Sequence, residues 1–187
     1  MVRATARRYA RWSGAALALV VTAGAAGCRS SAAAPPGPPG SAVVVRPVDG
    51  DTVIVRIGHV TERVRLIGVD TPESVSRVTP VECYGPEAKH RTAELLPPGT
   101  QVVLQRDVEA RDKYDRLLAY LTRLSDGAFV NRLLVEEGYA ASYRFPPNTA
   151  HEAELDRAEA AAKAAHRGLW PACGGTNTPL RQVASGG

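Results

Sequence analysis

The sequence lacks the features that mark several classes of protein. Its 187 residues include three cysteines and four scattered histidines, with no CxxC pair, which argues against a zinc site. No internal repeat is visible. Hydrophobic residues make up 44% and charged residues 22%, a composition that excludes a wholly disordered or collagen-like chain. The length suits one domain of ordinary size with a short tail.

Acidic residues are absent from the first 27 positions, which contain four arginines. Because those four belong to a total of 23 lysines and arginines, the remaining 19 basic residues balance the 19 acidic ones. The formal net charge of +4 therefore resides at the N-terminus and is no evidence for nucleic-acid binding. An attraction for phosphate would need a local cluster of positive charge.

A hydrophobic run long enough to cross a membrane is also missing at the N-terminus. Residues 12–27 are uncharged and mostly apolar, but a helix of that length spans about 24 Å, short of the roughly 30 Å of a bilayer core. With the arginines before it, this stretch predicts a signal peptide over residues 1–27, and an uncleaved anchor is the alternative.

Small residues precede Cys28 and resemble the lipobox of bacterial lipoproteins, although Ala25 stands where Leu is usual. We therefore predict an extracytoplasmic protein, either a membrane lipoprotein lipidated at Cys28 or a freely secreted one. Residues 29–41 are rich in Pro, Ala and Gly and predict a flexible linker. The folded domain is expected over residues 42–174, followed by a flexible tail over residues 175–187.

Short runs rich in Val, Leu and Ile predict five strands, at residues 42–48, 51–57, 62–69, 100–107 and 116–124. Helical spacing and Pro or Gly boundaries predict three helices, at residues 85–96, 129–137 and 148–166. The order indicates an α+β domain. A five-stranded β-barrel of the OB type fits, because closure removes exposed strand edges.

Two acidic residues fall at neighbouring ends of the second and third predicted strands. Asp51 opens one strand and Asp70 closes the other, so a hairpin would bring their carboxylates together. Two like charges this close favour a bound cation, and oxygen ligands suit Ca²⁺ or Mg²⁺. Pro72 biases Thr71 towards an extended backbone that can aim its carbonyl at the same point. The alternative is that both acids are ordinary turn residues.

Two arginines have side chains suited to phosphate, whose oxygens match the guanidinium fork. Arg116 begins the fifth predicted strand beside Lys113 and Tyr114. Arg65 precedes Asp70 by an odd number of residues, which puts the two on opposite faces of a strand unless a bend intervenes. The alternative for each arginine is a solvated surface position.

Five ordered blocks of sequence together resemble the staphylococcal nuclease (thermonuclease) family. They are DGDTV at 49–53, RLIGVDTPE at 65–73, YGPEA at 84–88, DKY-R-LAY at 112–120 and PN-H-E at 147–152. The resemblance covers residues 42–171. It implies a five-stranded OB-fold barrel with three helices and a Ca²⁺-dependent, sugar-nonspecific endonuclease that hydrolyses DNA and/or RNA.

The resemblance also implies roles for single residues. The Ca²⁺ ligands would be Asp51, Asp70 and the carbonyl of Thr71. Glu73 would activate the attacking water. The remaining positions would contact the phosphate, the nucleotide or the surroundings of the metal: Arg65 and Arg116 for the scissile phosphate, Lys113, Tyr114 and Tyr143 for the nucleotide and its terminal phosphate, and Asp49 for the surroundings of the metal.

The chain departs from the family pattern at a few positions. Asp115 and Leu117 flank Arg116 where the family often has Gly, and Asp115 adds an acid that can pair with the arginine. Phe145 stands where a Tyr is usual. The altered surroundings of Arg116 bear on rate and substrate affinity more than on the type of reaction.

If Cys28 is acylated, Cys83 and Cys173 remain as a possible pair, and the alternative is two free thiols. They look like the cysteine pair of some bacterial relatives. A bond would close a loop of about 90 residues, which stabilises a fold by up to roughly 4–5 kcal/mol. We expect such a bond to tie the C-terminal segment to the first helix, away from the acids and arginines, and to take no part in chemistry.

Two other functions are compatible with the sequence. One is a catalytically inactive OB module that binds nucleic acid or protein. The other is a surface lipoprotein that uses the fold only as a scaffold. Neither explains why both acids, both arginines and Glu73 are present together. We expect a monomer without a protein partner, with membrane contact only through the lipid of Cys28.

Overall fold

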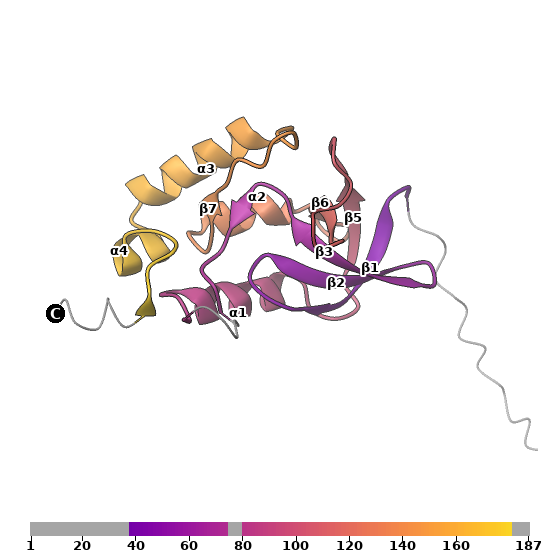
Figure 1. Cartoon of the computed structure of the whole chain (residues 1–187), viewed down its shortest axis with the longest axis horizontal. Coiled ribbons are helices and arrows are strands. Elements are labelled where there is room, and N and C mark those ends of the chain that lie inside the picture. The colour runs from indigo at the N-terminus through magenta and orange to yellow at the C-terminus, as the bar shows by residue number, and fades with distance from the viewer. Residues whose placement is uncertain (1–37, 75–79, 181–187) are drawn as a thin grey trace, which may run out of the picture. The chain divides into compact units, whose positions relative to one another are not determined.

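The computed structural model describes residues 38–74 and 80–180, all within the unit that spans residues 35–187 (Figure 1). The predicted signal peptide, Cys28 and most of the predicted linker lie outside the described residues and stay predictions. Among the helices that are described, none has the length and apolar character needed to cross a membrane.

Five strands close into a barrel in the order β1-β2-β3-β6-β5. Their bounds are β1 Ser41–Pro47, β2 Thr52–Ile57, β3 Val60–Leu66, β5 Gln101–Gln105 and β6 Leu117–Arg123. The β3–β6 pair is parallel, and the other pairs are antiparallel. This closed barrel confirms the predicted α+β class and the five-stranded OB architecture.

Alternation along the strands fills the barrel with apolar side chains. In β2, Val53 and Val55 are fully buried, and in β3 Val64 and Leu66 take the same inward positions. Their neighbours Arg56 and Arg63 point outward and are exposed. Each inward Val or Leu contributes about 1.5–3 kcal/mol when it is removed from water, so the period of two fixes the register of the hairpin.

The three predicted helices are present: α1 Gly85–Leu95 and α2 Val130–Glu136 pack on the barrel, and α3 Glu152–Ala164 packs on α2. The predicted start of α3 at residue 148 is wrong. The side chain of Asn148 is buried and accepts a hydrogen bond from the Glu109 amide, and the Ala150 amide binds Asp107. These groups are engaged by a distant loop, so the helix begins only at residue 152.

A fourth, short helix was not predicted. It is α4, Leu169–Cys173, and it follows α3 after a turn at Gly168 (Figure 1). A Cβ atom on Gly168 would lie 2.1 Å from the Gly138 carbonyl oxygen, so only glycine permits this close approach of the two turns. The approach carries α4 and the chain after it back towards α1.

The third predicted strand is interrupted. β3 ends at Leu66, and the chain resumes as β4 Val69–Asp70, which pairs with β7 Ala141–Ser142. The break occurs at Gly68, whose φ of 77° is a left-handed conformation that glycine adopts without strain. The side chain of buried Asn131 bridges the Ile67 carbonyl and the Leu121 amide, and this fixes the bend against β6.

Cys83 and Cys173 form a disulfide, as predicted, with Cα atoms 5.9 Å apart. The bond joins the entry of α1 to the end of α4. The chain beyond it also pairs with the segment before α1, because the Cys83 amide donates to the Thr178 carbonyl and the Leu180 amide to the Val81 carbonyl. Residues 175–180, which fall in the stretch predicted as a tail, therefore lie along residues 81–83.

Candidate active site

A cavity of about 530 Å³ opens at the end of the barrel where β2 begins and β3 ends. It gathers charged side chains from segments that are far apart in the sequence. The carboxylates that line it are Asp49, Asp51, Asp70, Glu73 and Glu82. The arginines that line it are Arg63, Arg65 and Arg116.

The turn between β1 and β2 delivers Asp49 and Asp51 to this cavity. Its middle residue, Gly50, is held by the buried hydroxyl of Thr92 on α1, which donates to the Gly50 carbonyl at 2.6 Å. A Cβ atom on Gly50 would lie 2.6 Å from the Thr71 hydroxyl oxygen, so glycine permits the turn to touch Thr71. Helix α1 thus helps to set the distance of Asp49 and Asp51 from Thr71.

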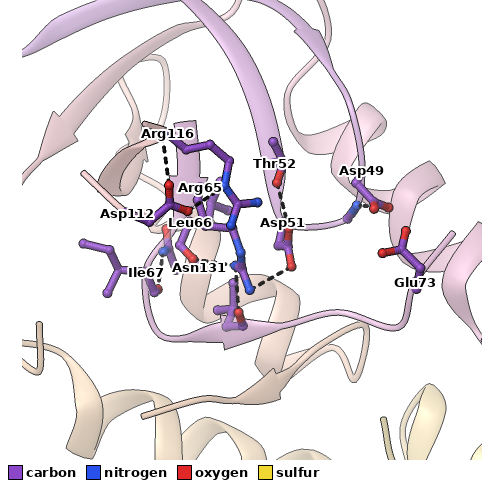
Figure 2. A network of polar contacts seen from close by, with 12 residues as sticks. Asp49, Asp51, Thr52, Arg65, Leu66, Ile67, Glu73, Asp112, Arg116 and Asn131 are labelled. Carbon is purple, nitrogen blue, oxygen red and sulfur yellow. Dashed lines mark hydrogen bonds and ion pairs between the residues drawn. The ribbon is translucent and has the colours of Figure 1, made fainter. Parts of the chain in front are cut away.

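Asp51 and Arg65 form an ion pair inside the cavity, with Arg65 Nη2 3.0 Å from Asp51 Oδ2. The two side chains are only 12% and 14% exposed. Arg65 Nη1 also donates to the carbonyls of Leu66 and Val69, and the Thr52 hydroxyl donates to Asp51 (Figure 2). Arg65 is therefore oriented on three sides and compensates the charge of Asp51.

Asp70 lines the same cavity as Asp51, because the bend at Gly68 turns it towards the barrel end. Burial raises the pKa of the Asp70 carboxyl. The positive charge of Arg65 opposes that rise, and the negative charge of Asp51 adds to it. Two carboxylates in one partly buried place are unfavourable without added positive charge, so the donors at this point suit a hard cation.

The cation would need more ligands than the two carboxylates. Among the described residues, no three acidic, histidine or cysteine side chains lie close enough together to bind a metal ion by themselves. Thr71 is buried directly after Asp70 and lines the cavity. Its backbone carbonyl and water oxygens are the kind of neutral ligands that Ca²⁺ sites add to carboxylates.

The backbone of Glu73 is fixed by the segment that precedes α1. The Glu73 amide donates to the Glu82 carboxylate at 3.0 Å, and the Glu82 amide donates to the Glu73 carbonyl at 2.9 Å. A Cβ atom on Gly85 would lie 2.4 Å from the Glu73 carbonyl oxygen. Glu73 is thereby held beside Asp49 (Figure 2). The Asp49 carboxylate accepts hydrogen bonds from the Gly50 amide and the Ser74 hydroxyl.

Arg116 enters the cavity from the turn before β6. Its Nε donates to Asp112 Oδ2 at 2.7 Å, and its amide donates to Asp112 Oδ1 at 2.9 Å (Figure 2). Burial raises the pKa of the Asp112 carboxyl, but the hydrogen bonds from Arg116 and from the Tyr114 amide, with the charge of Arg116, outweigh that effect and hold the pKa below its usual range. Asp112 is therefore a charged partner that orients Arg116.

Asp115 does not pair with Arg116, contrary to the possibility raised by the sequence. Its φ of 61° places it in a left-handed turn, and its carboxylate is directed to Arg111 Nε at 3.5 Å. The side chain is 87% exposed. Asp tolerates this conformation better than most residues, which is how the turn forms where the family often has Gly.

Exposed aromatic and basic side chains adjoin the acidic cavity. Tyr114 is 68% exposed, and its ring lies 5.0 Å from Lys113 Nζ and 5.5 Å from the Arg116 guanidinium. Tyr143 is 48% exposed and lies 6.1 Å from the ring of Phe145. A shallow hollow of about 550 Å³ contains Lys113, Tyr114, Arg116 and Phe145, so Arg116 borders both cavities.

Several residues that line the cavity or hold its lining in place were not singled out from the sequence. Asp112 lies inside a quoted motif, and its two hydrogen bonds to Arg116 depend on the turn geometry. Glu82 carries no motif of its own. Thr92 holds Gly50, and Asn177 lines the cavity, only through the packing of α1 and of the C-terminal segment. None of these contacts leaves a periodic or compositional signal in the sequence.

Comparisons with known proteins place this chain among nucleases. A family model described as staphylococcal nuclease homologue matches residues 63–172. The chain is 42% identical over 130 residues to a thermonuclease of Staphylococcus intermedius, covering 70% of this chain and 76% of that protein. It is 37% identical to a thermonuclease of Staphylococcus hyicus, covering 68% and 73%. An endonuclease of Bacillus subtilis (strain 168) is 35% identical, covering 69% and 61%.

Proposed function

Because the chain belongs to the staphylococcal nuclease family and is a nuclease, we propose that it is a Ca²⁺-dependent, sugar-nonspecific endonuclease that acts outside the cytoplasm. Its substrate is nucleic acid, DNA and/or RNA. The observation that carries the proposal is one cavity lined by Asp51, Asp70, Glu73, Arg65 and Arg116. In this set, the arginines can bind an anionic phosphodiester, and a carboxylate can activate a nucleophilic water.

Asp51, Asp70 and the Thr71 carbonyl would hold the Ca²⁺ ion. The support is the donor set, which consists of oxygen atoms, and the burial that raises the pKa of Asp70 beside a second carboxylate. When bound, the ion supplies positive charge that polarises a phosphoryl oxygen and relieves the repulsion between the acids. Asp49, fixed by the Gly50 amide, adds negative charge near this position.

Arg65 and Arg116 bind the non-bridging oxygens of the scissile phosphate and stabilise the charge that develops on them. Asp112 holds the Nε edge of Arg116, so that the guanidinium borders the cavity in a fixed direction. Arg65 is held in the same way by a different carboxylate, that of Asp51, and by hydrogen bonds to two backbone carbonyls. A fixed guanidinium costs little reorganisation when the charge appears.

Glu73 takes a proton from the attacking water as a general base. A carboxylate within reach of a water contributes typically 10²–10⁴-fold to such a step. Glu73 lines the same cavity as the arginines, and its backbone is held by Glu82. The proton moves from the water to a Glu73 oxygen as the new phosphorus–oxygen bond forms. The bond from phosphorus to one sugar oxygen breaks, and that oxygen leaves with the electron pair and takes up a proton from solvent.

Lys113, Tyr114 and Tyr143 bind the nucleotide and its terminal phosphate. Tyr114 is exposed beside Arg116, and Tyr143 is exposed beside Phe145, which lines the same hollow as Tyr114, so both rings can stack on unpaired bases. Stacking does not depend on the identity of the base or on the sugar. This supports a preference for exposed or frayed strands over any particular sequence.

The test is digestion of plasmid DNA and of single-stranded RNA by purified protein without residues 1–27 and with Cys28→Ser. Cleavage is expected with Ca²⁺, a lower rate with Mg²⁺ and none with EGTA. Cleavage that persists in EGTA would overturn the metal assignment. No cleavage under any condition, with intact binding of oligonucleotides, would instead identify a catalytically inactive binding module.

We also propose that residues 1–27 are a signal peptide and that Cys28 carries a lipid anchor, with the predicted linker, which was expected to end at residue 41, ending before β1 begins at Ser41. The support is the sequence alone. The test is fractionation of expressing bacteria followed by mass spectrometry of the N-terminus. Recovery of a diacylated Cys28 in the membrane is the expected result, and a soluble exported protein would favour free secretion.

A further inference from the structure

The acidic cavity contains more carboxylates than arginines, so its charge opposes the entry of an anion such as nucleic acid. One of the carboxylates, Glu82, is next to the disulfide-bonded Cys83. The expectation from the sequence that this bond lies away from the acids is therefore wrong. A bound cation would offset part of the negative charge, and the arginines must supply the rest of the attraction.

Two of the three arginines of the cavity are already paired with carboxylates. Arg65 is 3.0 Å from Asp51, and Arg116 is 2.7 Å from Asp112. Arg63 differs from both, because it lines the cavity with an exposed side chain that forms no ion pair or hydrogen bond within the part of the chain that the structure describes. An anion can therefore bind Arg63 without displacing another partner.

Strand β3 places Arg63 beside Arg65 on the outer face of the barrel. The two arginines are two residues apart, and Val64 between them is buried. Side chains at this spacing leave the strand about 7 Å apart. Arg65 pairs with Thr52 at the start of β2, and Arg63 pairs with Ile54, farther from the barrel end. Arg63 is thus the next cation along the strand from Arg65.

A nucleic-acid strand is the kind of ligand that suits two neighbouring cations, because it has one phosphate per nucleotide. A phosphate held between Arg65 and Arg116 is followed by another phosphate one nucleotide away. A strand that continues over the outer face of β3 brings this second phosphate to Arg63. The planar guanidinium can bind two of its oxygens at once.

We propose that Arg63 is a substrate-binding residue that contacts the phosphate next to the scissile one, so that the enzyme favours chains with at least two phosphates over a single phosphodiester. The inference rests on the proposed function, since it takes Arg65 and Arg116 as the residues that hold the scissile phosphate. The neighbouring phosphate does not change its charge during the reaction. Its contact with Arg63 therefore lowers KM and leaves kcat unchanged.

The first test compares Arg63→Gln with the wild type on two substrates. One is a thymidine trinucleotide with two phosphodiester bonds, and the other is a thymidine dinucleotide with one, both without terminal phosphates. For the trinucleotide we expect KM to rise about tenfold with kcat unchanged, the lower end of what a hydrogen bond to a charged group contributes. For the dinucleotide neither constant should change. Arg63→Lys keeps the charge and should recover part of the lost affinity.

The matched control is Arg56→Gln, which removes the same charge from the same hairpin. Arg56 is exposed on the outer face of β2 and pairs with Thr61, two positions beyond the pair of Ile54 and Arg63, and it does not line the cavity. Its KM for the trinucleotide should stay within about twofold of the wild type, because the charge is exposed and screened. Equal rises in KM for the Arg56 and Arg63 variants would show that only total charge matters and would overturn the assignment.

The second test removes the charge from the substrate instead of from the protein. In two further trinucleotides, one or the other phosphodiester is replaced by an uncharged methylphosphonate, so that one phosphodiester remains without a charged neighbour. The effect of Arg63→Gln on KM should disappear for both, since the two changes remove the same contact. An effect as large as with the unmodified trinucleotide would show that Arg63 acts elsewhere and would overturn the assignment.

A third measurement does not depend on turnover. Binding of a fluorescent oligothymidylate to Glu73→Gln protein with Ca²⁺ is followed at increasing salt concentration. Adding Arg63→Gln should reduce the slope of log affinity against log salt by about 0.7, the value for one phosphate contact on a single strand. An unchanged slope would mean that Arg63 contacts no phosphate.

The outcomes separate the inference from the proposed function. A wild type that cleaves the trinucleotide, beside an Arg63→Gln variant with an unchanged KM, overturns only the inference. A wild type that cleaves no nucleic acid under any condition overturns the proposed function and the inference with it.

Discussion

Arg65 and Arg116 border the same cavity, but they are held by different kinds of structure. Arg65 comes from barrel strand β3 and is bound to Asp51 and to two backbone carbonyls. Arg116 comes from an exposed turn and is bound to the Asp112 side chain, with the Tyr114 ring beside it. The barrel side of the cavity, which holds Arg65 and Asp51, is therefore fixed by the fold. The turn side, which holds Arg116, is fixed by its local pair with Asp112.

The difference suits the two partners that the proposed reaction requires. A small cation needs closely placed oxygen atoms, and the barrel side supplies them because strand register and the bend at Gly68 set the positions of Asp51 and Asp70. A polymeric substrate needs an accessible surface, and the turn side supplies exposed cations and rings. Substitutions on the two sides should therefore affect stability and catalysis in different proportions.

Arg116→Ala should give the largest loss with the least structural damage. We expect kcat to fall by about 10³-fold, in the range for removal of an arginine from a phosphoryl-transfer site. The melting temperature should remain close to that of the wild type, because the turn is exposed and Asp112 can be solvated. Steady-state cleavage of an oligonucleotide and thermal unfolding are the measurements. Arg56→Ala, on the outer face of β2, is the control and should leave kcat unchanged.

Glu73→Gln should lower kcat by about 10²–10⁴-fold, because the amide cannot accept the proton of the attacking water. The backbone contacts of Glu73 with Glu82 do not depend on the Glu73 side chain, so the fold should persist. Glu87→Gln on the exposed face of α1 is a matched control. A folded Glu73→Gln enzyme with the wild-type rate would remove Glu73 from the chemistry.

Arg65→Ala should lower stability as well as activity, unlike Arg116→Ala. It leaves Asp51 without its compensating charge in a partly buried place, which we expect to cost about 2 kcal/mol, below the range for a fully buried pair. Urea unfolding with and without Ca²⁺ measures the effect. Because a cation would replace the lost charge, Ca²⁺ should restore more stability in the variant than in the wild type. Equal Ca²⁺ effects on both proteins would contradict the placement of the ion beside Asp51.

The sequence carried enough information for the barrel, and for much of the cavity, for identifiable physical reasons. Alternating Val and Leu positions define strands because each inward side chain adds burial at every second residue. Asp51 and Asp70 were expected to meet because they flank one hairpin, and they do line one cavity. The bend that the Arg65 spacing required is present at Gly68.

The rest depended on contacts between segments that are distant in the chain. The predicted start of α3 failed because Asp107 and Glu109, from another loop, engage residues 148–150. The place of Asn177 in the cavity depends on the disulfide and on the pairing of residues 178–180 with residues 81–83. The predicted pair of Asp115 with Arg116 failed for a different reason. The left-handed backbone at Asp115 changes the direction in which its side chain leaves the turn, and the carboxylate meets Arg111 instead.

Asp115→Gly should have the smallest effect, and it tests the turn side of the comparison directly. Asp115 faces Arg111 and is almost fully exposed, so its removal leaves the pair between Asp112 and Arg116 intact. Glycine relieves the left-handed conformation but adds freedom to the unfolded chain, and the exposed ion pair contributes little. We expect the free energy of unfolding to change by less than about 1 kcal/mol. We also expect kcat/KM to stay within about threefold, since one exposed charge near an anionic substrate acts through screened solvent. Asp115→Asn separates charge from backbone, because asparagine tolerates the same conformation. A rise in kcat of tenfold or more in both variants would show that Asp115 competes with phosphate for Arg116, and that the turn side is not fixed by Asp112 alone.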